Sequence, residues 1–301
     1  MVKLHRVGFI WLKSWFYFLI ALGLLASVWY GCYWLAHAYA KLYLVYFRWG
    51  AYISLVMGGI LLIFNEPLVI LLTGAKLIRS RDESPKLWDA VQHAAPWYLR
   101  PGPRIYELPD HGMNAISFGW GIPLFSAVGA TSGAIDLEQE ELDAVMAHEV
   151  GHVINKDILV TMAMTISVMM MAYTGWLLLR VAPYSSGRRS SSKSSGGLAI
   201  LVVLLVGGVL YLFGRLLGLI LQAFVSRQRE YLADATSARI MGSSDPLIQA
   251  LRRIVRNPKI GSEVVGTAAG FLCTADPEPD DMMSTHPSVT ERIKTLSYLQ
   301  R

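Results

Sequence analysis

Charged residues are scarce in this sequence. Only 16% of its 301 residues are Asp, Glu, Lys or Arg, whereas 53% are hydrophobic and the mean hydropathy is +0.41. A soluble domain usually carries charge on about a quarter of its residues. The shortage excludes a chain built only of ordinary globular domains, and it indicates a membrane protein with a soluble part.

Cysteines and basic tracts are also few. Cys32 falls in an apolar run and Cys273 in a polar tail, so we do not expect them to pair, and neither has the spacing of a metal ligand. The net charge of +5 includes no Lys/Arg tract interleaved with aromatic residues in a polar segment. We therefore predict no nucleic-acid partner and attribute the excess charge to the flanks of membrane spans.

Long apolar runs are what the sequence has instead. A helical span needs about 20 apolar residues. The first run is longer than the ~7–15-residue core of a signal peptide, so we interpret it as a retained transmembrane helix. The runs predict about four transmembrane helices, near residues 15–38, 51–72, 158–181 and 198–224.

Two of these runs contain a charged residue. Glu66 precedes Pro67 in the second run, and the proline favours a kink or an early exit that leaves Glu66 near the interface or facing another helix. Arg215 interrupts the fourth run, where an arginine either snorkels to the interface or pairs with another helix.

The polar segments predict one soluble domain built from two separate stretches. We expect an N-terminal transmembrane hairpin, a first soluble part, a second transmembrane hairpin and a second soluble part, at residues 1–73, 74–157, 158–225 and 226–301.

The first soluble part has strand-like segments. Residues 104–108, 113–119 and 124–128 predict two or three short strands, and residues 85–95 a helix. The fold class expected is a mainly α membrane protein with a small sheet in its soluble α+β domain.

A metal-binding pattern follows these strands, at His148-Glu149-Val150-Gly151-His152. Residues four apart lie on one face of a helix, so both imidazoles can reach one cation while Glu149 works on a water. Asp136 as N-cap and Gln139 three residues later predict the start of that helix. Gly151 has no side chain, which would let another backbone approach the metal site.

A third ligand is expected because catalytic zinc usually takes three from the protein. Glu230 is the candidate, and Asp234 lies one turn later, where it would hold the outer nitrogen of a ligating histidine. The alternative is that both carboxylates form ordinary helix ion pairs with Arg227 or Arg239.

These motifs resemble the HtpX family of membrane-bound zinc metalloproteases, relatives of the CAAX prenyl proteases. The likeness rests on H-E-V-G-H at 148–152 and S-R-Q-R-E-Y-L-A-D at 226–234, with weaker matches at Met113-Asn114-Ala115 and at Ser284-Thr285-His286-Pro287 with Arg292. It implies a zincin-type (gluzincin) protease domain that holds one Zn²⁺ per chain.

The resemblance also implies the roles of single residues. It makes His148, His152 and Glu230 the zinc ligands and Glu149 the base. His286 and Arg292 would line the site, and Asn114 and Ala115 would belong to a strand that binds substrate. Three alternatives stay open: Asn114 as a turn residue, His286 as a helix cap before Pro287, and Arg292 in a surface ion pair near Glu291.

The function implied is a zinc endopeptidase that cleaves membrane or misfolded proteins, in membrane protein quality control. Its partners would be protein or peptide substrates and the lipid bilayer. A CAAX-type prenyl-protein protease is the nearest alternative, although such enzymes have more spans. A non-catalytic zinc-binding scaffold and an ion-conducting transporter are alternatives of other classes, and the transporter is disfavoured because Glu66 and Arg215 are isolated.

Topology follows from the positions of the ligands. Two spans separate His148 from Glu230, so both soluble parts and the N-terminus must share one side of the membrane. By the positive-inside rule this side is the cytoplasm of a plasma (inner) membrane, although one basic loop argues the other way. The clusters that decide it are Lys3/Arg6/Lys13, Lys76/Arg79/Arg81 and Arg227/Arg229, against Arg188/Arg189/Lys193.

Overall fold

The computed structural model describes residues 2–99, 101–185, 195–256 and 287–300. Cys273 and His286 lie outside these ranges. The chain divides into two compact units, of which the first combines Met1–Phe16, Leu62–Val160 and Ala223–Arg301, and the second Tyr17–Leu61 and Thr161–Gln222.

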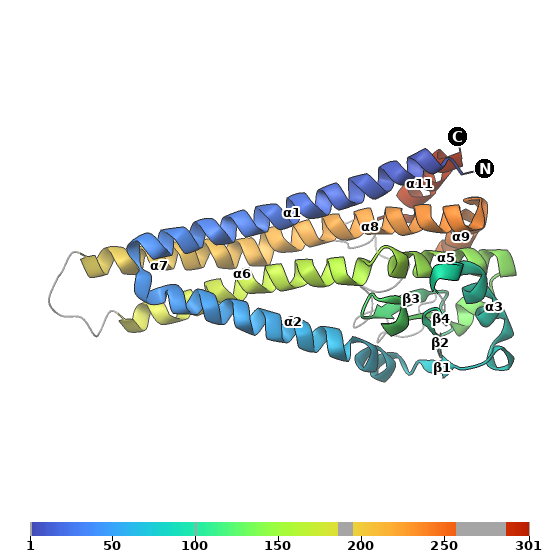
Figure 1. Ribbon diagram of the computed structural model, residues 1–301, viewed down its shortest axis with the longest axis horizontal. Helices are drawn as coiled ribbons and strands as arrows, with labels where there is room; N and C mark the ends of the chain where they lie inside the picture. The colour runs from blue at the N-terminus through green and yellow to red at the C-terminus, as the bar shows by residue number, and fades with distance from the viewer. Residues whose placement is uncertain (1, 100, 186–194, 257–286, 301) are drawn as a thin grey trace. The chain divides into compact units, whose positions relative to one another are not determined.

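The second unit is made of parts of four long apolar helices, which Figure 1 labels α1 (Leu4–Tyr39), α2 (Leu44–Thr73), α6 (Asp157–Ser185) and α7 (Ser195–Leu212). Among the described residues, four helices are long and apolar enough to cross a membrane. Helices suit that environment because they satisfy their backbone hydrogen bonds internally. The four predicted transmembrane helices are therefore confirmed.

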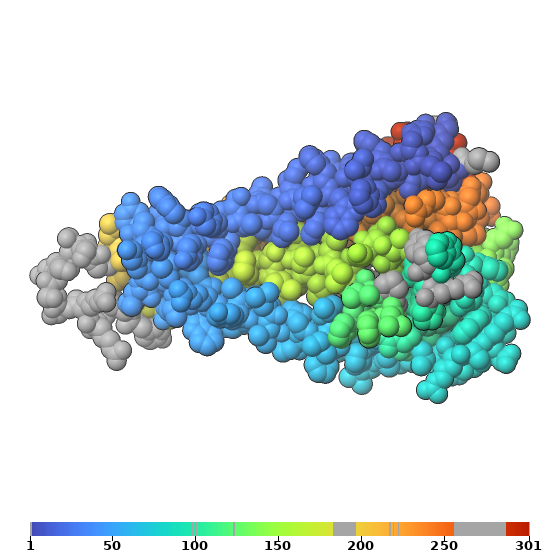
Figure 2. Space-filling view, viewed as in Figure 1, coloured from blue at the N-terminus to red at the C-terminus, as the bar shows by residue number. Residues whose placement is uncertain are grey.

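Apolar side chains cover the outside of this unit. Figure 2 shows one face of it, where α1 and α2 lie at the surface. A continuous apolar surface is what a protein presents to lipid rather than to water. Exposed members include Leu19, Tyr30, Trp34, Tyr52, Leu55, Leu201 and Leu205.

Small residues let these helices approach closely. A Cβ built on Gly50 of α2 would lie 2.0 Å from the Thr174 hydroxyl of α6, and one on Gly175 would lie 2.4 Å from the backbone nitrogen of Tyr211 in α7. Larger side chains at either glycine would force the helices apart, so close van der Waals packing at these positions helps to hold the helices together.

The fourth span does not stop where the apolar run ends. Helix α7 passes through a π-helical segment, Phe213–Leu217, into α8 (Gly218–Met241). One continuous helical run thus carries both Arg215 and Glu230.

The first unit contains a four-stranded sheet of order β1-β2-β4-β3. Strands β2 and β4 are parallel and the other pairs antiparallel. The predicted strand at 104–108 is confirmed, the next is two residues shorter than predicted, and the third begins two residues late because Pro123–Phe125 forms a 3₁₀ turn. The strands are β1 (Lys76–Ile78), β2 (Arg104–Leu108), β3 (Ala115–Gly119) and β4 (Ser126–Thr131).

Alternate residues of the strands face two different cores. Ile105 and Val128 join the main core beneath α5 (Gln139–Ile154), whereas Tyr106 and Phe118 point to the opposite face, where they meet Val69 of α2. Helix α5 packs on β3, β4 and further helices, and α11 packs on α9. The expected mainly α fold with a small sheet is confirmed; these helices are α3 (Pro85–Ala94), α9 (Asp245–Arg256) and α11 (Val289–Gln300).

The predicted N-cap of α5 is wrong. Asp136 instead ends the short helix α4 (Ser132–Ile135), which already turns the chain. The N-cap of α5 is Glu138, whose backbone N–H donates to the Glu141 carboxylate at 3.4 Å in a capping box. The box therefore uses an acidic pair two residues further along the chain.

The end of α2 is joined to the sheet. The Glu66 carboxylate accepts hydrogen bonds from Arg104 and, at 2.8 Å, from the Tyr106 hydroxyl, and the Asn65 side chain accepts one from the Gly119 N–H at 2.7 Å. Burial and the Glu66 carboxylate raise the pKa of Tyr106 to about 12. Glu66 therefore faces β2 rather than another helix, and α2 continues beyond Pro67 to Thr73.

Candidate metal centre

Three side chains converge from two helices. His148 and His152 lie four residues apart on α5, and Glu230 lies on α8. The two Nε2 atoms are 3.1 Å apart, and Glu230 oxygens lie 3.5 Å from Nε2 of His148 and 3.4 Å from Nε2 of His152. The sequence prediction that Glu230 meets the two histidines agrees with this geometry.

These distances fit a zinc ion. Bonds of about 2.0–2.1 Å in a tetrahedral arrangement separate neighbouring ligand atoms by about 3.3 Å. One donor atom from each of His148, His152 and Glu230 lies within 4.8 Å of the others, so the three can hold a metal ion. Two imidazoles and a carboxylate are a donor set that suits zinc.

A carboxylate fixes the orientation of each imidazole. Nδ1 of His148 lies 2.9 Å from Asp234, and Nδ1 of His152 lies 2.6 Å from Asp157. Each Nδ1 therefore keeps its proton for the carboxylate, so a neutral imidazole carries its lone pair on Nε2, on the side of Glu230. This arrangement points both free lone pairs at one position, which is what a cation requires.

A buried arginine stands behind each carboxylate. Nη2 of Arg292 donates to Asp234 at 2.6 Å and its Nε does so at 2.9 Å, while Arg229 donates to Asp157. Arg229 also contacts Ser14 of α1 and the backbone carbonyl of Asn155. Both arginines are at most 2% exposed, so they neutralise carboxylates that would be costly to bury alone.

These charges set the protonation of the site. Burial and Arg292 oppose protonation of His148, but hydrogen bonds to Asp234 and Glu230 outweigh them and raise its pKa to about 9. The pKa of His152 is also raised, since Glu230 and Asp157 outweigh its burial. Arg292 and His148 lower the pKa of Asp234 in spite of its burial, so this carboxylate stays ionised.

Close packing of α8 on α5 depends on Gly151. A Cβ at this position would lie 3.3 Å from the Ala233 carbonyl oxygen and 3.4 Å from the Ala233 Cα. The predicted approach of another backbone at Gly151 is confirmed. Because Ala233 lies between Glu230 and Asp234, this contact sets how near both carboxylates come to the histidines.

The structure gives Glu230 and Asp234 partners within the site. Both carboxylates pair with the histidines and with Arg292. Arg292 is 1% exposed and donates to Asp234, so it does not take part in a surface ion pair. Glu149 is also buried, in the turn of α5 between the two histidines.

Sequence reasoning missed Asp157 and Arg229. Asp157 follows His152 by five residues, after Lys156 turns the chain with a φ of 59° between α5 and α6. Arg229 directly precedes Glu230 and was counted only as membrane-flanking charge. The sequence does place Asp157 just past the end of the motif helix and Arg229 beside the third candidate ligand. Neither spacing by itself indicates that these residues contact the site.

Asn114 and Ala115 lie at the start of β3, which is an edge strand of the described sheet and packs against α5. The Asn114 side chain accepts a hydrogen bond from the Ala115 N–H at 2.9 Å, and its backbone pairs with Thr131. Asn114 therefore fixes the backbone directly before this strand.

Comparison with known proteins agrees with this site. The family model described as Peptidase family M48 matches residues 83–300, which include the motif helix, Glu230 and α11. The chain belongs to peptidase family M48. It is a membrane-bound zinc metalloendopeptidase, as its resemblance to the HtpX family implies.

Several relatives carry the name Protease HtpX homolog. The protein from Leuconostoc citreum is 31% identical over 258 residues, covering 83% of this chain and 85% of the relative. The one from Aquifex aeolicus is 32% identical over 265 residues, covering 84% and 85%. Among solved structures, Ste24p from S. mikatae is 18% identical with a TM-score of 0.49, over 95% of this chain and 66% of that one.

Proposed function

We propose that the enzyme cleaves membrane or misfolded proteins at the cytosolic face of the membrane. His148, His152 and Glu230 hold one zinc ion, and Glu149 is the general base. The observation that carries this proposal is the convergence of three ligand atoms within 4.8 Å, with Glu149 beside them on the same helix.

The chemistry follows from the positions of these side chains. His148, His152 and Glu230 would hold the zinc ion, which would supply a water of lowered pKa, toward ~7, and a Lewis acid for the scissile carbonyl. Glu149 accepts the proton of the attacking water and returns it to the leaving amine. Asp157 and Asp234 keep the imidazoles oriented throughout, and Arg292 acts through Asp234.

Substrate binding is assigned to the edge of the sheet. An extended peptide can add to an edge strand by main-chain hydrogen bonds. Asn114 and Ala115 open β3, whose packing against α5 supports a peptide position near the histidines. His286 is retained from the family resemblance as a donor to the oxyanion.

The proposed topology has two transmembrane hairpins, residues 1–73 and 158–225. They alternate with two parts of the protease domain, residues 74–157 and 226–301. Both termini and the site then lie in the cytoplasm. Support comes from the even number of spans between His148 and Glu230 and from the excess of basic residues on that side.

The test is proteolysis by the purified protein in detergent. We expect wild type to contain one zinc per chain and to cleave casein, with cleavage abolished by a chelator. Glu149→Gln should keep the zinc and lower kcat by about 10²–10⁴, because only the proton transfer is lost. Full activity of this variant would exclude Glu149 as the base, and an inactive but zinc-loaded wild type would indicate a scaffold.

A further inference from the structure

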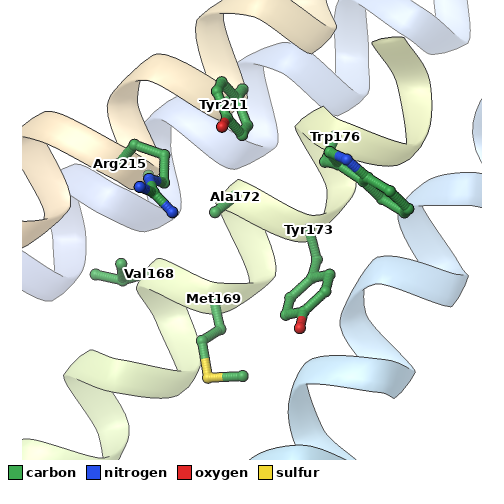
Figure 3. Close-up of a pocket in the computed structure, with 8 residues that line it drawn as sticks. Val168, Met169, Ala172, Tyr173, Trp176, Tyr211 and Arg215 are labelled. Carbon is green, nitrogen blue, oxygen red and sulfur yellow. The ribbon is translucent and has the colours of Figure 1, made fainter. Parts of the chain in front are cut away.

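A cavity in the second unit is not part of the metal centre. It has a volume of about 690 Å³ and lies between α6 and the π-helical segment with the end of α7. Figure 3 shows the side chains of Arg215 and Ala172 on facing helices, with Tyr173 and Trp176 further along α6. Its lining is apolar and aromatic except for the one guanidinium.

Arg215 is the only charged residue among the described residues that line this cavity. No hydrogen bond or ion pair joins Arg215 to another described residue. The predicted pairing with another helix therefore does not explain its charge within the described part of the chain. An ionisable side chain within a span is costly, and in membrane proteins it usually serves a function. It lies in a π-helical turn, a local distortion that is frequent at functional sites.

The depth of Arg215 follows from its neighbours. A Cβ on Gly214 would lie 2.7 Å from the backbone nitrogen of Ala172, so the π segment packs directly on that part of α6. Ala172 lies near the middle of the candidate span Asp157–Ala182, about 15 Å from one end and about 22 Å from the other at 1.5 Å per residue. With α6 centred in a hydrocarbon core about 30 Å thick, the level of Ala172, and with it the Arg215 backbone, lies inside the core.

This depth restricts the anion that can reach the guanidinium. Lipid phosphates lie outside the hydrocarbon core, at least several ångströms beyond the level of Ala172. A carboxylate at this level must be carried by a segment that itself crosses the membrane. Coulombic attraction between the two charges is strong there because the dielectric constant is low.

We propose that this cavity binds an Asp or Glu side chain in a membrane-spanning segment of a protein substrate. Arg215 pairs with the carboxylate, and the aromatic side chains of Tyr173 and Trp176 contact the apolar neighbours of that acid. The substrate class is thus a membrane protein whose span carries an unpaired acid, as an unassembled or misfolded membrane subunit does. This inference rests on the proposed function.

The test uses the full chain in vesicles of zwitterionic lipid. Two single-span substrates share one cytosolic cleavage site and differ only in an Asp or a Leu at mid-span, and casein serves as a soluble substrate. We expect wild type to cleave the Asp substrate about tenfold faster in kcat/KM than the Leu substrate, because removing one partner of a desolvated charge pair is costly. Arg215→Gln should remove this preference and leave casein cleavage unchanged.

Arg180 offers a matched control. It lies on α6 in the same unit but stacks on the Trp176 ring at 5.4 Å and does not line the cavity. Arg180→Gln should keep the preference for the Asp substrate. Arg215→Glu combined with a Lys-bearing substrate should restore the faster rate, which a merely structural role of Arg215 would not allow.

Several outcomes would overturn the proposal. These are a preference that persists in Arg215→Gln, an equal loss on both membrane substrates, or a defect that appears only when anionic lipid is added. If Arg215→Gln loses its zinc, wild type is assayed instead with substrates that carry the acid at different depths in the span. Only an acid near mid-span should then accelerate cleavage. Casein cleavage without any preference would reject this inference alone, whereas no cleavage of any substrate would reject the proposed function too.

Discussion

At the scale of single residues, the metal centre is two copies of one arrangement. His148 and His152 each donate a hydrogen bond from Nδ1 to an aspartate, and each aspartate is held by a buried arginine. The arginines come from different elements, α8 and α11, so the candidate site brings together side chains from α5, α6, α8 and α11. Such partners of metal ligands fix the tautomer and raise the basicity of the imidazole.

Asp157→Asn should weaken zinc binding. The amide cannot carry the charge that Arg229 and the His152 proton both contact, so the imidazole loses its orientation. We expect zinc affinity to fall by about 10–100-fold, measured by competition with a chromophoric chelator. Asp143→Asn is the control, because Asp143 lies on α5, the helix of His152, and holds His93 at 2.9 Å outside the site. An equal loss in both variants would mean that the helix, not the ligand, was damaged.

Zinc binding should also depend steeply on pH. A histidine must be neutral to ligate a metal, and the pKa of His148 is raised to about 9, so protons compete with zinc at every pH below that value. The apparent affinity should fall by at least about tenfold for each unit that the pH decreases below about 9, since the pKa of His152 is raised too. In Asp234→Asn the acceptor that favours the protonated form is weakened, so the fall should begin at a lower pH. A pH-independent affinity in wild type would contradict this competition.

At the scale of elements, the sheet is fixed to the end of the second transmembrane helix. Asn65 and Glu66 bind β3 and β2 from the last turns of α2, next to the apolar contact of Val69 with the lower face of the sheet. Since β3 also packs on α5, the anchor connects α2 through the sheet to the helix that carries His148 and His152. Glu66 therefore has a structural partner and needs no role in ion conduction.

Glu66→Gln should destabilise the first unit. The Tyr106 hydroxyl loses a charged acceptor, an interaction of about 1.5–3 kcal/mol. The ion pair with Arg104 adds little, since that guanidinium is 43% exposed. We expect a lower midpoint of thermal unfolding with zinc stoichiometry retained, and the pKa of Tyr106 should fall from about 12. Tyr106→Phe should lower the midpoint similarly, and the double variant should add little, whereas fully additive effects would rule out a shared interaction.

Local patterns were enough to predict some elements but not their partners. The four spans and the motif helix follow from apolar runs and spacing, and the pairing of His148 with Glu230 follows because two spans return the chain. The strand β1, with only three residues, carries too little pattern to recognise. Contacts such as Glu66 with Tyr106, or Asp157 with Arg229, join residues far apart in sequence and depend on tertiary packing alone. The N-cap prediction at Asp136 was wrong because α4 ends directly before this residue. Only Asp136, Leu137 and Glu138 separate α4 from α5.

At the scale of the whole molecule, the candidate active site is built from two stretches of the sequence that two candidate transmembrane helices separate. His148 precedes the third and fourth candidate spans and Glu230 follows them, so we expect zinc binding to require that these two spans be inserted as a pair. An orientation with the site in the cytoplasm has a direct consequence for labelling. Residues of the polar segments, including Lys76 and Ser243, should be reachable only from the cytosolic side, and the Ser-rich loop near Lys193 only from the opposite side.

This topology can be measured with single cysteines introduced into a chain that has Cys32 and Cys273 replaced by Ser. Ser243→Cys should react with a membrane-impermeant maleimide only after the cells are opened, whereas Lys193→Cys should react in intact cells. The reason is the even number of spans between the two soluble parts together with the basic clusters that favour the cytoplasm. Proteolytic activity of each variant serves as the control for native insertion. Labelling of Ser243→Cys in intact cells, with activity retained, would place the metal centre outside and reverse the proposed access of substrates.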